Sequence, residues 1–176
     1  GGLKTDAVRN EFILPPDALA AAQAFLAAPN FSAGKPLMFV QALTSSPHKN
    51  WPLENYLALA RHWQARGWQV IFGGGPADHV ALEPARAAGF AVSAGVPLLA
   101  TGGLMQLCKL IVGGDTGALH LAVAQGKRVV MLMHHGRQGR PHPFRHPEWS
   151  LPPPVDGDIA AIRLDAVIAA CEQVPA

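Results

Sequence analysis

Short apolar runs alternate along the chain with segments in which apolar residues recur every three or four positions. The runs cover residues 37–43, 68–72, 110–113 and 128–133, and a shorter one lies near residues 90–92. Strands of a parallel sheet are buried on both faces, so they read as continuous apolar runs of about this length. Each run is therefore predicted to be a buried strand.

The segments between these runs have the periodicity of amphipathic helices. The clearest helix begins near residues 50–52, carries apolar residues on one face as far as Trp63 and ends at Gly67. Further helices are expected over residues 16–28, from residue 77 or 78 to about 88, over 103–109, from the turn at 117 to Gly126, and over 158–174. Strands that alternate with helices at this spacing predict an α/β fold with a doubly wound, Rossmann-like parallel sheet.

Residues 110–133 combine a strand, a polar turn, a helix and a second strand. The two glycines before Asp115 are expected to end the first strand, and Thr116 and Gly117 lead into the helix. The first N–H groups of a helix lack partners within it and favour an anion, and a glycine there lets a ligand approach the backbone. His120 lies one turn further on the same face. The turn thus predicts a phosphate site, whereas the alternative is that Asp115 or Thr116 only caps the helix.

Two other polar turns also follow predicted strands. One carries the hydroxyls of Thr44 and Ser45 and the cation of Lys49, and the other is a tight glycine-rich turn at residues 73–76, followed by Asp78. Ligands of doubly wound sheets bind beyond the carboxyl ends of the strands, so the turns should open onto one cleft suited to a diphosphate. Taken singly, Lys49 could be a solvated loop residue and Asp78 a helix cap. The triple glycine is not G-x-G-x-x-G, which disfavours an NAD enzyme.

Composition narrows the class of protein further. With 176 residues, 49% of them apolar and 15% charged, the sequence predicts one compact domain and not a disordered chain. A scattered net charge of +2 does not favour nucleic acid binding. No apolar segment is long enough to span a membrane, and no secretory signal opens the sequence.

Cys108 and Cys171 lack C-x-x-C spacing and are expected to be buried thiols in a reducing compartment. The eight histidines form no metal-binding motif, so no metal is expected.

Two segments differ from this regular pattern. Residues 1–15 show no clear periodicity. Residues 134–154 are rich in His, Arg and Pro and contain almost no aliphatic side chains, which favours a surface loop or flap. Because this segment follows the strand that ends at Met133, we expect it to flank the cleft and to be the least ordered internal region.

Two stretches resemble the heptosyltransferases of glycosyltransferase family 9. The first is TSSPHKNWPLENYLALA with the following GGGPAD. It is similar to that family's small-polar loop, its K-x-W-P-x-x-x-[WY] helix start and its Gly-Gly-Pro turn with an acidic residue close behind. The second is GGDTGALHLAVAQGKRVVMLM, similar to the family's D-[TS]-G-x-x-H-x-A-A-x-x-x-x-P-V-V block. The likeness covers residues 35–133 well, the C-terminal helix weakly and residues 1–34 hardly at all.

The resemblance implies one half of a two-domain B-type glycosyltransferase fold. Residues 35–176 would be the nucleotide-sugar (donor) binding domain and residues 1–34 a lead-in segment and helix, while the N-terminal acceptor domain, which holds the family's catalytic base, lies outside this chain. By the same resemblance, the residues that contact the donor diphosphate would be Thr44, Ser45, Lys49, Thr116, Gly117 and His120. Asp115 would contact the transferred sugar, and Leu104 and Met105 would contact the base and ribose. Asp78 would lie near the donor. The sequence departs from the family at Arg128, where proline is usual, and at residues 133–135, where G-P-T is frequent.

The resemblance further implies an inverting transfer of a sugar from a nucleoside diphosphate, with ADP-heptose as the donor and a lipopolysaccharide or related surface glycan as the acceptor. No cofactor or metal is expected, the membrane would be contacted at most peripherally, and the location would be the cytoplasm at the inner face of the bacterial inner membrane. The fragment alone would be inactive. The alternative function is a non-catalytic α/β module that binds a nucleotide or phosphate.

Overall fold

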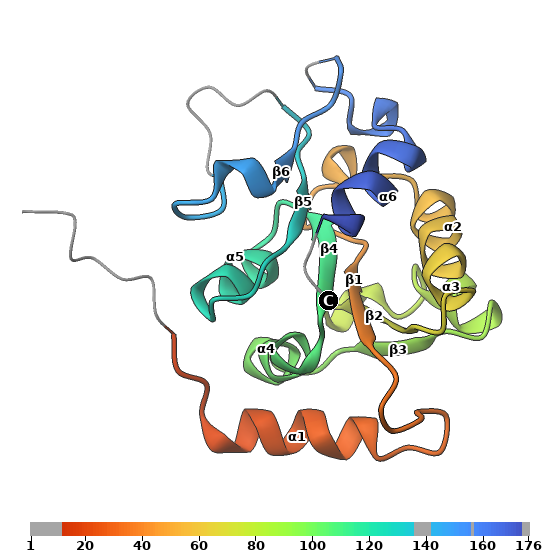
Figure 1. Cartoon of the computed structure of the whole chain (residues 1–176), viewed down its shortest axis with the longest axis vertical. Coiled ribbons are helices and arrows are strands. Elements are labelled where there is room, and N and C mark those ends of the chain that lie inside the picture. Colours follow the sequence, from red (N-terminus) through yellow and green to blue (C-terminus); the bar gives the residue numbers. More distant parts are fainter. Residues whose placement is uncertain (1–11, 136–141, 156, 174–176) are drawn as a thin grey trace, which may run out of the picture.

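The computed structural model describes residues 12–135, 142–155 and 157–173, and it confirms the doubly wound parallel sheet. Within these residues the sheet has six strands, all parallel, in the order β3-β2-β1-β4-β5-β6 (Figure 1). The strands are β1 Leu37–Gln41, β2 Gln69–Gly74, β3 Ala91–Ala94, β4 Leu110–Gly114, β5 Val130–Leu132 and β6 Ser150–Leu151. The chain reverses its direction of travel across the sheet between β1 and β4, which is where ligands bind in such folds.

Helices cover both faces of the sheet, and a hydrophobic core lies on each face. Helices α2, α3 and α6 pack on one face, and α4 and α5 on the other, with α1 packed on α4 across the bottom of the view in Figure 1. The bounds are α1 Pro16–Leu26, α2 Leu53–Gln64, α3 Glu83–Ala87, α4 Leu98–Leu107, α5 Gly117–Ala124 and α6 Leu164–Glu172, with short 3-10 turns η2 Pro47–Lys49, η3 Pro76–Asp78, η4 Pro147–Trp149 and η5 Ile159–Ala161.

The glycine pairs at the ends of β2 and β4 continue their strands, so the prediction that they break them was wrong. A side chain at Gly73 would place its Cβ 2.1 Å from the ring of Phe39, and one at Gly113 would lie 2.5 Å from the backbone oxygen of Gln41. These residues are glycine because the neighbouring strand leaves no room for a side chain, while their extended backbone still pairs in the sheet.

Three predicted helices also differ from the structure. The helix expected over residues 77–88 is divided into η3 and α3, with Pro84 in the first turn of α3. Helix α4 begins at Leu98, five residues before the expected start, because Gly103 is an interior helical position packed against the backbone of Ala18. The last helix is divided into η5 and α6 at Ile162, which is extended and accepts a hydrogen bond from Trp51.

The described C-terminal part of the segment at residues 134–154 is more regular than a surface loop. Its end forms η4 and the edge strand β6, and the Met133 N–H donates to the Leu151 carbonyl at 2.9 Å. The sequence prediction therefore missed a strand, since two residues are too short for a recognisable apolar run. Residues 136–141, on which the prediction of low order mainly rests, lie outside the described residues, as do residues 1–11.

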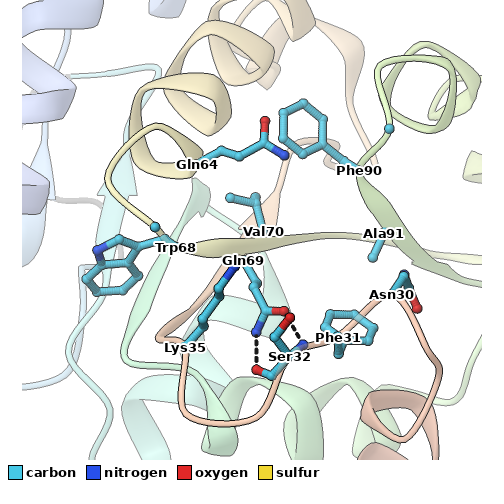
Figure 2. Close-up of a pocket in the computed structure, with 12 residues that line it drawn as sticks. Asn30, Phe31, Ser32, Lys35, Gln64, Trp68, Gln69, Val70, Phe90 and Ala91 are labelled. Carbon is cyan, nitrogen blue, oxygen red and sulfur yellow. Dashed lines mark hydrogen bonds between the residues drawn. The ribbon is translucent and has the colours of Figure 1, made fainter.

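A small cavity of about 210 Å³ lies at the amino end of β2, the edge of the sheet opposite the predicted ligand rim (Figure 2). The Gln69 side chain bridges the backbone N–H and C=O of Ser32 there, at 2.6 and 3.0 Å. Lys35 and Trp68 also line this cavity, and both therefore lie far from the carboxyl ends of the strands.

Candidate functional site

The loops that follow β1, β4 and β5 meet at the carboxyl end of β4. These strands are neighbours, with Gln41 opposite Gly113 and Gly114 opposite Leu132. Each loop therefore leaves the sheet at nearly the same level (Figure 1). We call this group of loops the rim; it comprises residues 44–49, 114–120 and 133–135.

Gly114 is the point where the first two loops touch. A Cβ atom on Gly114 would lie 2.8 Å from the Thr44 methyl carbon and 3.4 Å from the Lys49 carbonyl oxygen. Only a glycine allows the loop after β1 to lie this close to the end of β4. Two segments far apart in the sequence are thus brought side by side, as their positions after parallel strands predict.

Hydrogen bonds within the loop after β1 set its shape. The Thr44 N–H donates to Asn50 Oδ1 at 2.7 Å. The Thr44 hydroxyl donates to the Ser46 carbonyl at 2.8 Å and accepts from the Ser46 N–H at 3.1 Å. Ser45 is exposed and Lys49 half-buried. The Thr44 hydroxyl is engaged by its own loop, so a role for it in binding a phosphate requires that the hydroxyl exchange this partner. Sequence reasoning missed Asn50, because an amide that braces a loop has no sequence signature of its own.

Asp115 and His120 form a pair across the first turn of α5. His120 Nε2 lies 2.9 Å from Asp115 Oδ1, and the Asp115 side chain is only 13% exposed, against 34% for His120. The hydrogen bond from His120 lowers the pKa of Asp115, aided by the charges of His120, Lys49 and His135 and opposed by burial. Asp115 is consequently a carboxylate at neutral pH, and Lys49 and His135 lie close enough to act on it.

Thr116 caps α5, and Gly117 leaves the space in front of the helix open. The Thr116 hydroxyl oxygen accepts from the Leu119 N–H at 3.4 Å, which agrees with the alternative that this residue is a helix cap. Apart from the adjacent residues and the backbone of α5 itself, no atom lies within 4 Å of the position that a Cβ on Gly117 would occupy. The N–H groups at the start of α5 can therefore be approached closely by an anion.

Gly117→Val is expected to fold normally and to bind a nucleoside diphosphate less tightly. A Cβ at this position meets no other part of the protein, and the two branches of Val would occupy the space through which a ligand must approach the helix start. Gly117→Ala, with a single methyl group, should fall between Val and the parent. The melting temperatures and dissociation constants of the three proteins test this expectation. Binding that is equally tight in all three would place the anion away from α5.

Asp78 makes a structural contact in the turn after β2, and Leu104 and Met105 lie in the core. The Asp78 carboxylate accepts the Gly75 N–H at 2.7 Å and caps η3, which agrees with the alternative of a structural role. Leu104 and Met105 are buried in the core between α4 and the sheet, in the second half of α4. Their side chains cannot line a nucleotide site at the carboxyl edge, and the periodicity of an amphipathic helix explains them as core residues.

The rim also contains three histidines that sequence reasoning did not assign to the site: His48, His134 and His135. The His48 and His134 rings meet edge to face with their centroids 5.5 Å apart, and those of His134 and His135 lie 4.6 Å apart. His135 is buried. The signal in the sequence was the departure at residues 133–135, which places two imidazoles directly after a strand that ends at the rim.

Neither a membrane-spanning helix nor a cluster of metal ligands is found in the part of the chain that the structure describes. No helix there is long and apolar enough to cross a bilayer. No three His, Cys, Asp or Glu side chains of the described residues group so as to hold a metal ion.

Comparisons with known proteins give a family and a set of similar folds. The sequence model of glycosyltransferase family 9 (heptosyltransferase) matches residues 2–147. No curated protein matches at a significant level. A glycosyltransferase family 9 structure from Veillonella parvula aligns with 20% identity and a TM-score of 0.81, covering 93% of this chain and 53% of that one.

Two solved structures from E. coli are also similar. ADP-heptose lps heptosyltransferase II aligns with 21% identity and a TM-score of 0.77, over 93% of this chain and 53% of that one. Heptosyltransferase WaaC with ADP-2-deoxy-2-fluoro heptose aligns with 19% identity and a TM-score of 0.63, over 86% and 47%. At these identities the likeness shows the fold alone. The chain spans about half the length of these structures.

Proposed function

Because the chain belongs to glycosyltransferase family 9, we propose that it binds the nucleoside diphosphate of a sugar donor at the rim. The observation that carries this proposal is the meeting of the Lys49 loop and the α5 start at Gly114. The two loops bring a flexible cation and unpartnered helix N–H groups to one place. A diphosphate needs both, since a cation and backbone N–H groups give the strong, charge-assisted contacts.

Within this proposal the diphosphate lies between Lys49 and Gly117, with His120 beside it. Thr44, Ser45 and Thr116 offer hydroxyls, and Asp115 faces the transferred sugar. Since His120 is held by Asp115 at 2.9 Å, it is oriented before the donor arrives. These protein groups supply the positive charge and hydrogen-bond donors that the diphosphate requires. Asp78 contributes indirectly, because its hydrogen bond with the Gly75 N–H shapes the turn after β2.

We propose that the base and ribose lie against the start of α4 and not against Leu104 and Met105. Leu98 is 53% exposed and Leu99 39%. Gly102 of α4 lies beside Leu121 of α5. Each of these residues is about one turn from the start of its helix, so we expect the exposed leucines to lie on the side of α4 nearest the start of α5. An exposed apolar surface beside a phosphate site is suited to a planar base.

ADP-heptose is the proposed donor, and a lipopolysaccharide or related surface glycan is the proposed acceptor. The similar E. coli proteins support this choice, since one is an ADP-heptose lps heptosyltransferase and another is in complex with ADP-2-deoxy-2-fluoro heptose. In this proposal the reaction takes place in the cytoplasm, at the inner face of the bacterial inner membrane.

The chemistry proposed for the rim is stabilisation of the leaving group. In an inverting transfer a base activates the acceptor hydroxyl while the nucleoside diphosphate departs with growing negative charge. Lys49 and the α5 N–H groups stabilise that charge. We propose that residues 35–176 are the donor half and that the base belongs to an N-terminal acceptor domain outside this chain, which would leave this half inactive alone. The coverage of about half of each similar structure supports this division.

Titration of the chain with ADP, UDP and GDP tests the proposal. ADP is expected to bind at the rim and to shift the amide NMR signals of residues 114–120 in preference to those of residues 30–35 at the opposite edge. Failure of all three nucleotides to bind would contradict the proposed function. Preference for UDP or GDP would retain a donor site and exclude ADP-heptose.

A further inference from the structure

The three histidines of the rim, His48, His134 and His135, form a continuous row of imidazole rings that we call the histidine wall. It joins the loop after β1 to the loop after β5, since His48 belongs to η2 and contacts His134 edge to face. His134 in turn contacts His135. The wall therefore spans the end of β4, which lies between β1 and β5 in the sheet.

Two observations place this wall beside the proposed diphosphate. Gly114 lies opposite Leu132 in the β4–β5 ladder, so Asp115 is level with Met133 and the wall begins one residue later. The charge of His135 also acts on Asp115, as does that of Lys49. A diphosphate held between Lys49 and α5 thus lies within electrostatic range of the wall.

Neighbouring imidazoles resist being protonated together. Rings with centroids 4.6 and 5.5 Å apart repel once two of them carry a charge. A bound diphosphate offsets this repulsion, because its negative charge stabilises an imidazolium nearby. Binding of the anion and uptake of a proton are then coupled.

We propose that the histidine wall is part of the donor site and takes up a proton when a nucleoside diphosphate sugar binds. This inference rests on the proposed function. It assigns to His48, His134 and His135 a binding role that makes donor affinity depend on pH. Among the residues that the structure describes, the titratable or charged groups on the neighbouring elements include Lys49 on η2, Asp115 after β4 and His120 on α5. His142, ahead of β6, lies against the Ser150 hydroxyl.

The direction of the pH dependence follows from the sign of the coupling. A bound anion raises the pKa of a nearby histidine. The protonated histidine therefore contributes its full share of the binding free energy at a pH below the pKa of the ligand-free protein. That contribution is lost as the pH rises through the pKa of the ligand-bound protein. Asp115, whose pKa is already lowered, remains charged over the same range. Donor affinity should therefore rise as the pH falls from 8 to 6.

Calorimetric titration with ADP-heptose at pH 6.0, 7.0 and 8.0 tests this inference. A sugar diphosphate has no terminal phosphate monoester, the group that titrates with a pKa of about 6, so its own charge is constant over this range. Affinity is expected to increase about threefold to tenfold for each unit of pH lowered, which corresponds to roughly half to one proton taken up. Repeating the titration in buffers of different ionisation enthalpy counts that proton directly.

His48→Gln and His134→Gln should each flatten the pH dependence while keeping a polar side chain, and His48 is exposed, so its replacement should not disturb folding. His62→Gln is the matched control, since His62 lies near the end of α2 that faces the opposite edge. If the parent binds ADP-heptose equally at all three pH values, or if His48→Gln and His134→Gln both retain the full dependence, the inference is wrong and the donor site stands. If the parent does not bind ADP-heptose at any pH, the proposed ADP-heptose donor fails and the inference fails with it.

Discussion

Lys49→Ala is expected to weaken nucleoside diphosphate binding on the order of tenfold or more without unfolding the protein. A charge-assisted contact to a phosphate contributes about 1.5–3 kcal/mol, and every 1.4 kcal/mol changes a dissociation constant about tenfold. Lys49 is half-buried at the rim, where a contact is screened less than on an open surface. Titration calorimetry of parent and variant with ADP measures the difference.

The matched control for this experiment is Lys35→Ala. Lys35 is an exposed lysine that lines the cavity at the opposite edge of the sheet, so its loss changes the net charge equally and leaves the rim intact (Figure 2). Equal weakening by both variants would indicate only a general charge effect. If Lys49→Ala and His120→Ala both bound as tightly as the parent, the diphosphate site would have to lie elsewhere.

Loss of the charge of Lys49 should also change Asp115 in a defined way. Lys49 is one of several groups that lower the pKa of this carboxyl, and the hydrogen bond from His120 has the largest effect. In Lys49→Ala the pKa of Asp115 should rise but stay below its ordinary value. His120→Ala should raise it further, which a carbon-detected NMR titration of the carboxyl can resolve.

Trp51→Ala is expected to cost about 3–5 kcal/mol of unfolding free energy, as truncation of a fully buried aromatic side chain does. Trp51 is 1% exposed, packs edge to face on Tyr56 at 4.9 Å and donates its Nε1–H to the Ile162 carbonyl at 2.8 Å. This is a large part of the roughly 5–15 kcal/mol that stabilises a domain. Because Trp51 follows Lys49 by two residues, donor binding should weaken too. Urea unfolding followed by circular dichroism measures the loss.

Two further variants separate the contributions of Trp51. Trp51→Phe keeps much of the ring packing but leaves the Ile162 carbonyl without its donor, so its cost should be smaller, about 1–3 kcal/mol. Trp68→Ala removes a partly exposed tryptophan at the amino end of β2 and is the control for aromatic content. A loss in Trp68→Ala as large as in Trp51→Ala would contradict an anchoring role specific to Trp51.

The amino-acid sequence by itself determined the order and kind of the main elements. Buried strands such as β1 and β4 appear as unbroken apolar runs because both of their faces are covered, and α2 appears as a repeating apolar stripe because only one of its faces is. Once strands alternate with helices, right-handed crossovers leave few topologies. The position of Lys49 and Gly117 after parallel strands was enough to predict that both loops reach one rim.

Only the tertiary structure decided what a neighbouring element imposes on a residue. Gly113 could have ended a strand, and it continues one because the Gln41 backbone occupies the place of its side chain. Leu104 had the apolar character of a base-binding residue, yet the core of the second helical layer buries it. The contact of His48 with His134 joins residues 86 positions apart. The local sequence pattern shows which face of its own helix or strand a residue occupies. The roles of Gly113, Leu104 and His48 depend instead on which atoms of another helix, strand or loop lie beside them.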